Sequence, residues 1–168
     1  MTELDDIRRI KDQYFATDTY SPLTPEQQQH FQGLSYFPEN PALRLEVQVE
    51  EFAEKDTVVM QTTTGDEREY TRYGRIKFSV NDQPAELTLY SGEHGFFLPF
   101  VDALAGIDTY PAGRYLEPEP LHGNTFLVDF NTAYNPYCAY NDQWSCPITP
   151  FENRLKVPIN AGEKLFHA

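Results

Sequence analysis

LRLEVQVE, residues 43–50, decides the fold class of this 168-residue chain. Its odd-numbered positions are apolar (Leu43, Leu45, Val47 and Val49), and its even-numbered positions carry charged or amide side chains. Successive side chains of a β-strand point to opposite faces of the sheet. This alternation therefore predicts a strand with one buried face and one solvated face.

The same period of two recurs on the C-terminal side of this stretch. Gly65-Asp66 suits a tight hairpin turn, Gly74 predicts a bulge within a long strand, and residues 81–84 (NDQP) predict another turn. Regular strands separated by such turns are typical of barrels and sandwiches. We therefore expect a mainly β protein, a β-rich α+β fold built as an antiparallel β-barrel or sandwich with short N-terminal helices. Further strands are predicted at residues 58–63, 70–80, 85–90, 96–100, 125–130 and 155–159.

The N-terminal side of the chain has helical periodicity instead. Apolar residues recur at helical spacing from Leu4 to Phe15, with Thr2 or Asp5 suited to cap the start. A second short helix is predicted after Thr24, with a proline at its first position.

Length and composition indicate a globular protein. Hydrophobic residues make up 40% of the chain and aromatic residues 14%, which is far too apolar for a disordered tail. We expect a single domain, residues 1–168, in which a helical arm (residues 1–40) packs on a β-rich core (residues 43–168). The core is expected to include an ordered loop, residues 131–153.

The net charge of −13 argues against several classes of partner. Acidic residues are densest in residues 1–56, and such a field repels phosphate backbones, so we expect no nucleic-acid binding. No apolar run approaches the roughly 20 residues of a membrane helix, and the N-terminal sequence does not resemble a signal peptide. We therefore expect a cytoplasmic protein without a membrane partner. The sequence leaves its oligomeric state open.

Several motifs together resemble one family. The longest is the block NPYCAY (135–140), followed by CP (146–147), ENRL (152–155) and AGEK (161–164). With SPL (21–23), YGR (73–75), FLPF (97–100), GRYL (113–116) and DFN (129–131), the chain resembles the bacterial and archaeal family catalogued as domain of unknown function 1684. This resemblance implies no particular reaction. Where similar sequences often read DATSG, this chain has DALAG at residues 102–106, which weakens any proposal of a hydroxyl nucleophile there.

Both cysteines, Cys138 and Cys146, lie in the aromatic loop. A zinc site normally needs two closely spaced ligand pairs, and the four histidines are scattered singly, so we expect neither a metal nor another cofactor. Two readings remain for the cysteines: a disulfide that stiffens the loop, or two reduced, buried thiols packed beneath it. Catalysis by a cysteine nucleophile would need an adjacent base, which the spacing does not indicate.

Polar residues that bracket the loop are the candidate binding residues. An aromatic wall with a few convergent polar groups is typical of ligand pockets, and an arginine suits a ligand carboxylate or phosphate. We therefore expect a small-molecule-binding domain with a polar and aromatic cavity near residues 129–154. The candidate ligand-binding residues are Asp102, Arg114, Asp129, Asn131, Tyr134, Asn135, Asn153 and Arg154.

Two other classes of function remain open. One is a hydrolase-type enzyme using acid–base chemistry from Asp129, Asp102 or His122, and the other is a structural or protein-interaction module. A carboxylate and a histidine within hydrogen-bonding reach would favour the enzyme. A flat, exposed aromatic patch without a cavity would favour the interaction module.

Overall fold

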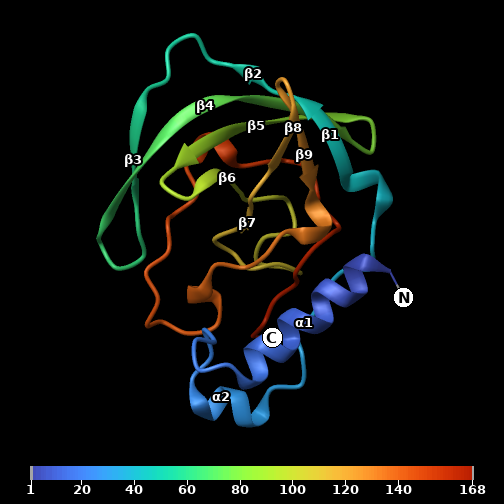
Figure 1. Cartoon of the computed structure of the whole chain (residues 1–168), viewed down its shortest axis with the longest axis vertical. Helices are drawn as coiled ribbons and strands as arrows, with labels where there is room; N and C mark the ends of the chain where they lie inside the picture. The colour runs from blue at the N-terminus through green and yellow to red at the C-terminus, as the bar shows by residue number, and fades with distance from the viewer. Residues whose placement is uncertain (1, 168) are drawn as a thin grey trace.

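Two antiparallel sheets and two short helices form the structure, a computed structural model that describes residues 2–167 (Figure 1). The larger sheet has the strand order β2-β4-β5-β6-β7, with β3 also paired to β4, and the smaller sheet has the order β1-β9-β8. The strands are β1 (Arg44–Gln48), β2 (Glu50–Glu51), β3 (Thr57–Gln61), β4 (Glu67–Val80), β5 (Gln83–Gly92), β6 (Gly95–Phe100), β7 (Arg114–Leu116), β8 (Glu119–His122) and β9 (Thr125–Asp129).

Turn chemistry accounts for the long hairpin of β4 and β5. Asn81 and Asp82 both have positive φ angles, 50° and 66°, which asparagine and aspartate tolerate better than most residues. The predicted bulge is confirmed, because the register of β4 against β5 shifts between Arg72 and Gly74. A Cβ at Gly74 would lie 2.6 Å from a methyl carbon of Val49, so only glycine lets β2 approach β4 this closely.

The hydrophobic core lies between the two sheets. Leu43, Val47 and Val49 are buried in this core. The alternation of apolar and polar residues along residues 43–50 predicted this buried face. Phe126, Val128 and Phe130 enter the core from the smaller sheet and the turn after it, while Ile76, Leu87, Leu89, Leu98 and Phe100 enter from the larger one. The β-rich α+β class is confirmed, and the strands of residues 2–167 form two separate sheets that do not close into a barrel.

The helices α1 (Glu3–Thr17) and α2 (Pro25–His30) lie together at one end of the molecule, away from β4 and β5 (Figure 1). Both predicted N-caps form: Thr2 and Thr24 each accept a hydrogen bond from the backbone N–H three residues later. Phe15 of α1 packs with Leu23 and Tyr140 in a second hydrophobic cluster. This cluster attaches the helices to loop 131–153.

The strand expected at residues 155–159 does not form. Its backbone groups bond singly instead: Leu155 N–H to the carbonyl of Val101, the carbonyl of Val157 to Ala103 N–H, and Ile159 N–H to the Asp102 carboxylate. Pro158 lacks an N–H and cannot join a regular ladder. Loop 131–153 contains three short 3₁₀ turns, η2 (Phe130–Thr132), η3 (Tyr137–Ala139) and η4 (Phe151–Asn153).

Candidate functional site

Two adjoining hollows, of about 810 and 450 Å³, form a groove between the larger sheet and loop 131–153. Both are lined by Arg68, Tyr115, Glu117, Tyr134 and Pro147. The larger hollow extends along the β5–β6 turn, and the smaller one extends toward α1. We call this depression the aromatic groove. Its other aromatic lining residues are Tyr70, Phe96 and Phe97 in the larger hollow and Phe15, Tyr137 and Trp144 in the smaller.

The walls of the groove are held by ring-to-ring contacts. Tyr70 stacks on Phe97 with centroids 5.2 Å apart, and Phe97 meets Tyr115 edge-on at 4.8 Å. Trp144 meets Tyr137 edge-on at 5.2 Å, and its indole N–H donates to the carbonyl of Pro22 at 2.9 Å. Such contacts fix flat apolar surfaces before any ligand arrives.

Tyr134 and Glu117 lie where the hollows meet. The backbones of Tyr115 and Tyr134 exchange two hydrogen bonds, of 2.8 and 3.0 Å, which attach the loop to β7. The Tyr134 hydroxyl donates to Glu117 Oε1 at 2.6 Å. Burial, together with this carboxylate, raises the pKa of Tyr134 far above its usual value, so the hydroxyl stays a donor. Among the ion pairs of residues 2–167, none involves Glu117.

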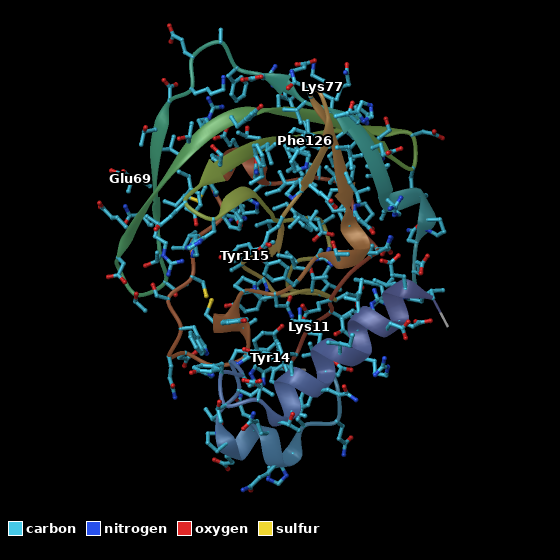
Figure 2. All side chains as sticks on the ribbon, in the orientation of Figure 1. Lys11, Tyr14, Glu69, Lys77, Tyr115 and Phe126 are labelled. Atoms are coloured by element: carbon cyan, nitrogen blue, oxygen red, sulfur yellow. The ribbon has the colours of Figure 1, made fainter. Side chains whose placement is uncertain are left out.

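Lys11 lines the end of the groove nearest α1, on the side of the helix that faces Tyr115 (Figure 2). Its Nζ lies 2.6 Å from Glu163 Oε2 and 5.3 Å from the centroid of the Tyr134 ring. Glu163 is 1% exposed, and it also accepts hydrogen bonds from the Tyr140 hydroxyl and from Asn135 N–H. Burial and the Glu163 charge raise the pKa of Tyr140. The charge of Lys11 is therefore largely neutralised within the protein.

Arg114 and Asp102 lie together, away from the groove, around the C-terminal segment. The guanidinium of Arg114 is fully buried and donates to the carbonyls of Ile159, Ala161 and Glu163. Its Nη2 lies 3.6 Å from Asp102 Oδ2, which accepts the N–H of Ile159 at 2.7 Å. Burial lowers the pKa of Arg114, while the two neighbouring carboxylates act in the opposite direction. We call this arrangement the Arg114 clamp.

Asp129 and Asn131 face a separate hollow, of about 540 Å³, beside α1. The Asn131 amide exchanges two hydrogen bonds with the backbone of Asn40, at 2.7 and 2.9 Å, and also donates to Asp129 Oδ1. Asp129 lies 3.7 Å from Arg44. Both side chains therefore tie the segment before β1 to the end of β9.

The remaining candidates are dispersed. Asn135 bonds Glu163 and the carbonyl of Lys164, and Asn153 is buried between β5 and β6, whereas Arg154 is exposed. Of the eight candidate residues, Tyr134 alone lines the groove. The structure thus does not bring the eight together, and ligand binding by any of them, Tyr134 included, stays a prediction.

The residues named for the hydrolase alternative are not paired as a carboxylate and a histidine. Asp102 belongs to the Arg114 clamp, Asp129 bonds Asn131, and His122 is exposed on β8. Within residues 2–167 no histidine is hydrogen-bonded to a carboxylate, and no group of three or more His, Cys, Asp or Glu side chains is arranged to hold a metal.

Sequence reasoning missed Lys11, Arg68 and Glu117 as groove residues. Lys11 did give a signal, because it interrupts the apolar face of a predicted helix. Glu117 follows the GRYL motif directly, but β7 and β8 were not predicted, so nothing placed Glu117 beside Tyr134.

Cys138 and Cys146 are free thiols in the structure and lie against each other. The N–H of Cys138 points at the Cys146 sulfur at 3.3 Å. Cys146 is buried and lines the groove, whereas Cys138 is partly exposed. The disulfide between them stays a prediction.

The fold and groove define a β-rich α+β protein with an aromatic depression beside a cysteine-containing loop. The model of a family described as "Protein of unknown function (DUF1684)" matches residues 29–164, so the chain belongs to this family. A similar solved structure is the solution NMR structure of the uncharacterized protein from gene locus rrnAC0354 of Haloarcula marismortui. It is 33% identical, with a TM-score of 0.72, and the match covers 98% of this chain and 95% of that one. No curated protein matches. No helix within residues 2–167 has the length and apolar character to cross a membrane.

Proposed function

We propose that this protein binds a small organic cation in the aromatic groove. The observation that carries the proposal is the position of Glu117, a carboxylate without a cationic partner among residues 2–167, at the centre of an aromatic depression. The faces of aromatic rings attract cations, most strongly where water is partly excluded. A ligand with a flat apolar body and an amine would use both features.

The charges around the groove support a cation over an anion. Glu93 adds a second exposed carboxylate at the β5–β6 turn, and Lys11 is already paired with Glu163. Arg68 donates to the carbonyl of Ser145 at 2.8 Å and keeps its positive charge. The three carboxylates that line the larger hollow, Glu69, Glu93 and Glu117, outnumber it. The net charge of −13 also raises the local concentration of cations around the protein. The enzyme and interaction-module alternatives stay predictions.

Trp144 provides the test, because it is the single tryptophan of the chain and lines the groove. We expect phenethylamine, titrated to about 10 mM at fixed ionic strength, to change Trp144 fluorescence saturably. Phenylacetate, which replaces the amine by a carboxylate, is expected to bind far more weakly. Glu117→Gln should weaken phenethylamine binding about fivefold, for roughly 1 kcal/mol of lost charge interaction.

Glu119→Gln is the matched control, since it removes a charge of the same kind two residues away and outside the groove. It should leave phenethylamine binding unchanged. Equal responses to the amine and the carboxylate, no saturable response at all, or equal losses in the two variants would each refute the proposal.

A further inference from the structure

The thiols of Cys138 and Cys146 form a second site, which the proposed groove function does not use. Two hydrogen bonds with Thr63 hold Cys146 in place: Thr63 N–H donates to the Cys146 carbonyl at 3.1 Å, and Cys146 N–H donates to the Thr63 hydroxyl at 3.2 Å. Cys138 is the middle residue of the 3₁₀ turn η3 and directs its N–H at the Cys146 sulfur. The hydroxyl of Tyr110 also donates to the Cys138 sulfur, at 3.8 Å.

These contacts make the two thiols chemically unequal. The hydrogen bond from the Cys146 thiol, assisted by the Tyr110 hydroxyl, outweighs burial and lowers the pKa of Cys138 to about 6. The same interaction, together with burial, raises the pKa of Cys146. Cys138 is therefore mainly a thiolate at neutral pH, and the thiolate is the reactive form of cysteine.

Cys138 and Cys146 also differ in their exposure to solvent. Cys138 is partly exposed and accessible to a small reagent, whereas Cys146 is 6% exposed and lies behind it. The other titratable or charged groups that face the pair are Tyr110, Tyr115 and Arg68, and Asp142 acts on Tyr110. An accessible thiolate beside a second thiol is the arrangement that oxidation-sensitive cysteines require. Two sulfurs without further ligands fit zinc poorly.

We propose that Cys138 and Cys146 are a peroxide-oxidisable dithiol, in which Cys138 attacks hydrogen peroxide and Cys146 then closes a disulfide. In the first step the Cys138 sulfur forms a bond to one peroxide oxygen and the O–O bond breaks. The leaving hydroxide takes a proton to become water, and Cys138 is oxidised to a sulfenic acid. In the second step the Cys146 sulfur gives up its proton and attacks the Cys138 sulfur. The S–O bond breaks, and a second water leaves.

The two sulfurs supply two electrons, the Cys146 thiol supplies one proton and the solvent supplies the other, because Cys138 starts as a thiolate, and one hydrogen peroxide becomes two waters. The disulfide would close the loop of residues 138–146, which forms one wall of the groove. The inference rests on the thiols alone, so a failure of cation binding in the groove would leave it standing.

Intact-mass measurement of the reduced protein after stoichiometric hydrogen peroxide tests the proposal. The wild-type protein should lose the mass of two hydrogen atoms, with recovery on treatment with dithiothreitol. Cys146→Ser should instead gain one oxygen atom, in a form that dimedone traps. Cys138→Ser should react at least about tenfold more slowly, because the remaining thiol is buried and protonated.

The rate at which the wild-type protein loses thiols to hydrogen peroxide can also be measured as a function of pH. The rate of thiol loss should rise with pH around a midpoint near 6. Tyr110→Phe removes one donor to the thiolate and should move this midpoint upward, whereas Tyr20→Phe, at an exposed tyrosine, should not. A wild-type midpoint at the ordinary thiol value near 8.5, or persistent sulfenic or sulfinic acid without a disulfide, would overturn the proposal.

Discussion

The side chain of Asn153 takes the place of missing backbone hydrogen bonds between strands β5 and β6. β5 and β6 pair from Tyr90 to Gly92, but the ladder stops before Thr88, because Pro99 opposite has no N–H to donate. The side chain of Asn153 fills the position: its oxygen accepts Thr88 N–H at 2.8 Å, and its nitrogen donates to the carbonyls of Thr88 and Pro99 at 2.9 and 2.8 Å. One fully buried amide thus satisfies three backbone groups.

We expect Asn153→Ala to lower the free energy of unfolding by about 3 kcal/mol, because buried backbone groups left without partners cost roughly 1–3 kcal/mol each and water recovers part of that loss. Urea denaturation monitored by circular dichroism measures the change. Asn160→Ala is the matched control, and since Asn160 is exposed it should change stability by less than about 0.5 kcal/mol. Similar losses in the two variants would show that Asn153 does not carry the junction.

At the scale of elements, the short turn η4 joins the C-terminal part of the chain to the larger sheet. Next to Asn153, the carboxylate of Glu152 accepts hydrogen bonds from the Thr88 hydroxyl and the Tyr90 hydroxyl of β5, at 2.8 and 2.6 Å. Arg72 of β4 donates two more, at 3.2 and 2.7 Å. Burial alone would raise the pKa of Glu152, but the bonds from Arg72, Tyr90 and Thr88 outweigh it and lower the pKa to about 2.

This shift predicts an acid-dependent loss of stability. Because the folded-state pKa lies below the unfolded value near 4.5, the contribution of Glu152 is fully present above pH 4.5 and is lost as the pH falls toward 2. Glu152→Gln should be less stable than wild type at pH 6, and the difference should shrink as the pH falls through this window. Urea denaturation at several pH values measures it, with Glu119→Gln as the control. A difference that stays constant with pH would contradict this role for Glu152.

Elements that depend on local sequence were predictable, and those that depend on distant partners were not. The caps at Thr2 and Thr24, the alternation around Val47 and the bulge near Gly74 all follow from a few neighbouring residues. The three residues of β7 form a strand because β6 and the backbone of Tyr134 flank them. Most of the groove could not be foreseen for the same reason: Lys11, Arg68 and Glu117 meet only after folding.

Across the whole molecule, negative charge is in excess. The chain carries 26 acidic and 13 basic residues, and the eight ion pairs among residues 2–167 leave many carboxylates at the surface without a partner. Like charges confined to one compact body repel each other, and salt screens that repulsion over about 10 Å at 0.1 M. The folded state therefore carries an electrostatic strain that depends on ionic strength.

We expect the thermal unfolding midpoint to rise by several degrees between about 10 mM and 500 mM sodium chloride. Differential scanning calorimetry measures the shift. A variant with three exposed acids neutralised, Glu54→Gln, Asp56→Asn and Glu69→Gln, should respond less to salt; Glu69 lies in the β3–β4 hairpin, opposite Val59 (Figure 2). A midpoint that falls with salt, or an equal response in the variant, would show that self-repulsion does not limit stability.

The Arg114 clamp also constrains how the protein folds during its synthesis. Arg114 leaves the ribosome well before residues 159–163, whose carbonyls are its partners in the finished fold. Burying the guanidinium without them would cost about 3–5 kcal/mol, so the nascent chain keeps this side chain in water. The core next to Phe100, over whose ring the guanidinium lies, must then stay open until translation has passed residue 163. This part of the fold therefore forms only after residues 159–163 have left the ribosome, and until then the partly formed sheets expose apolar surface to which a chaperone can bind.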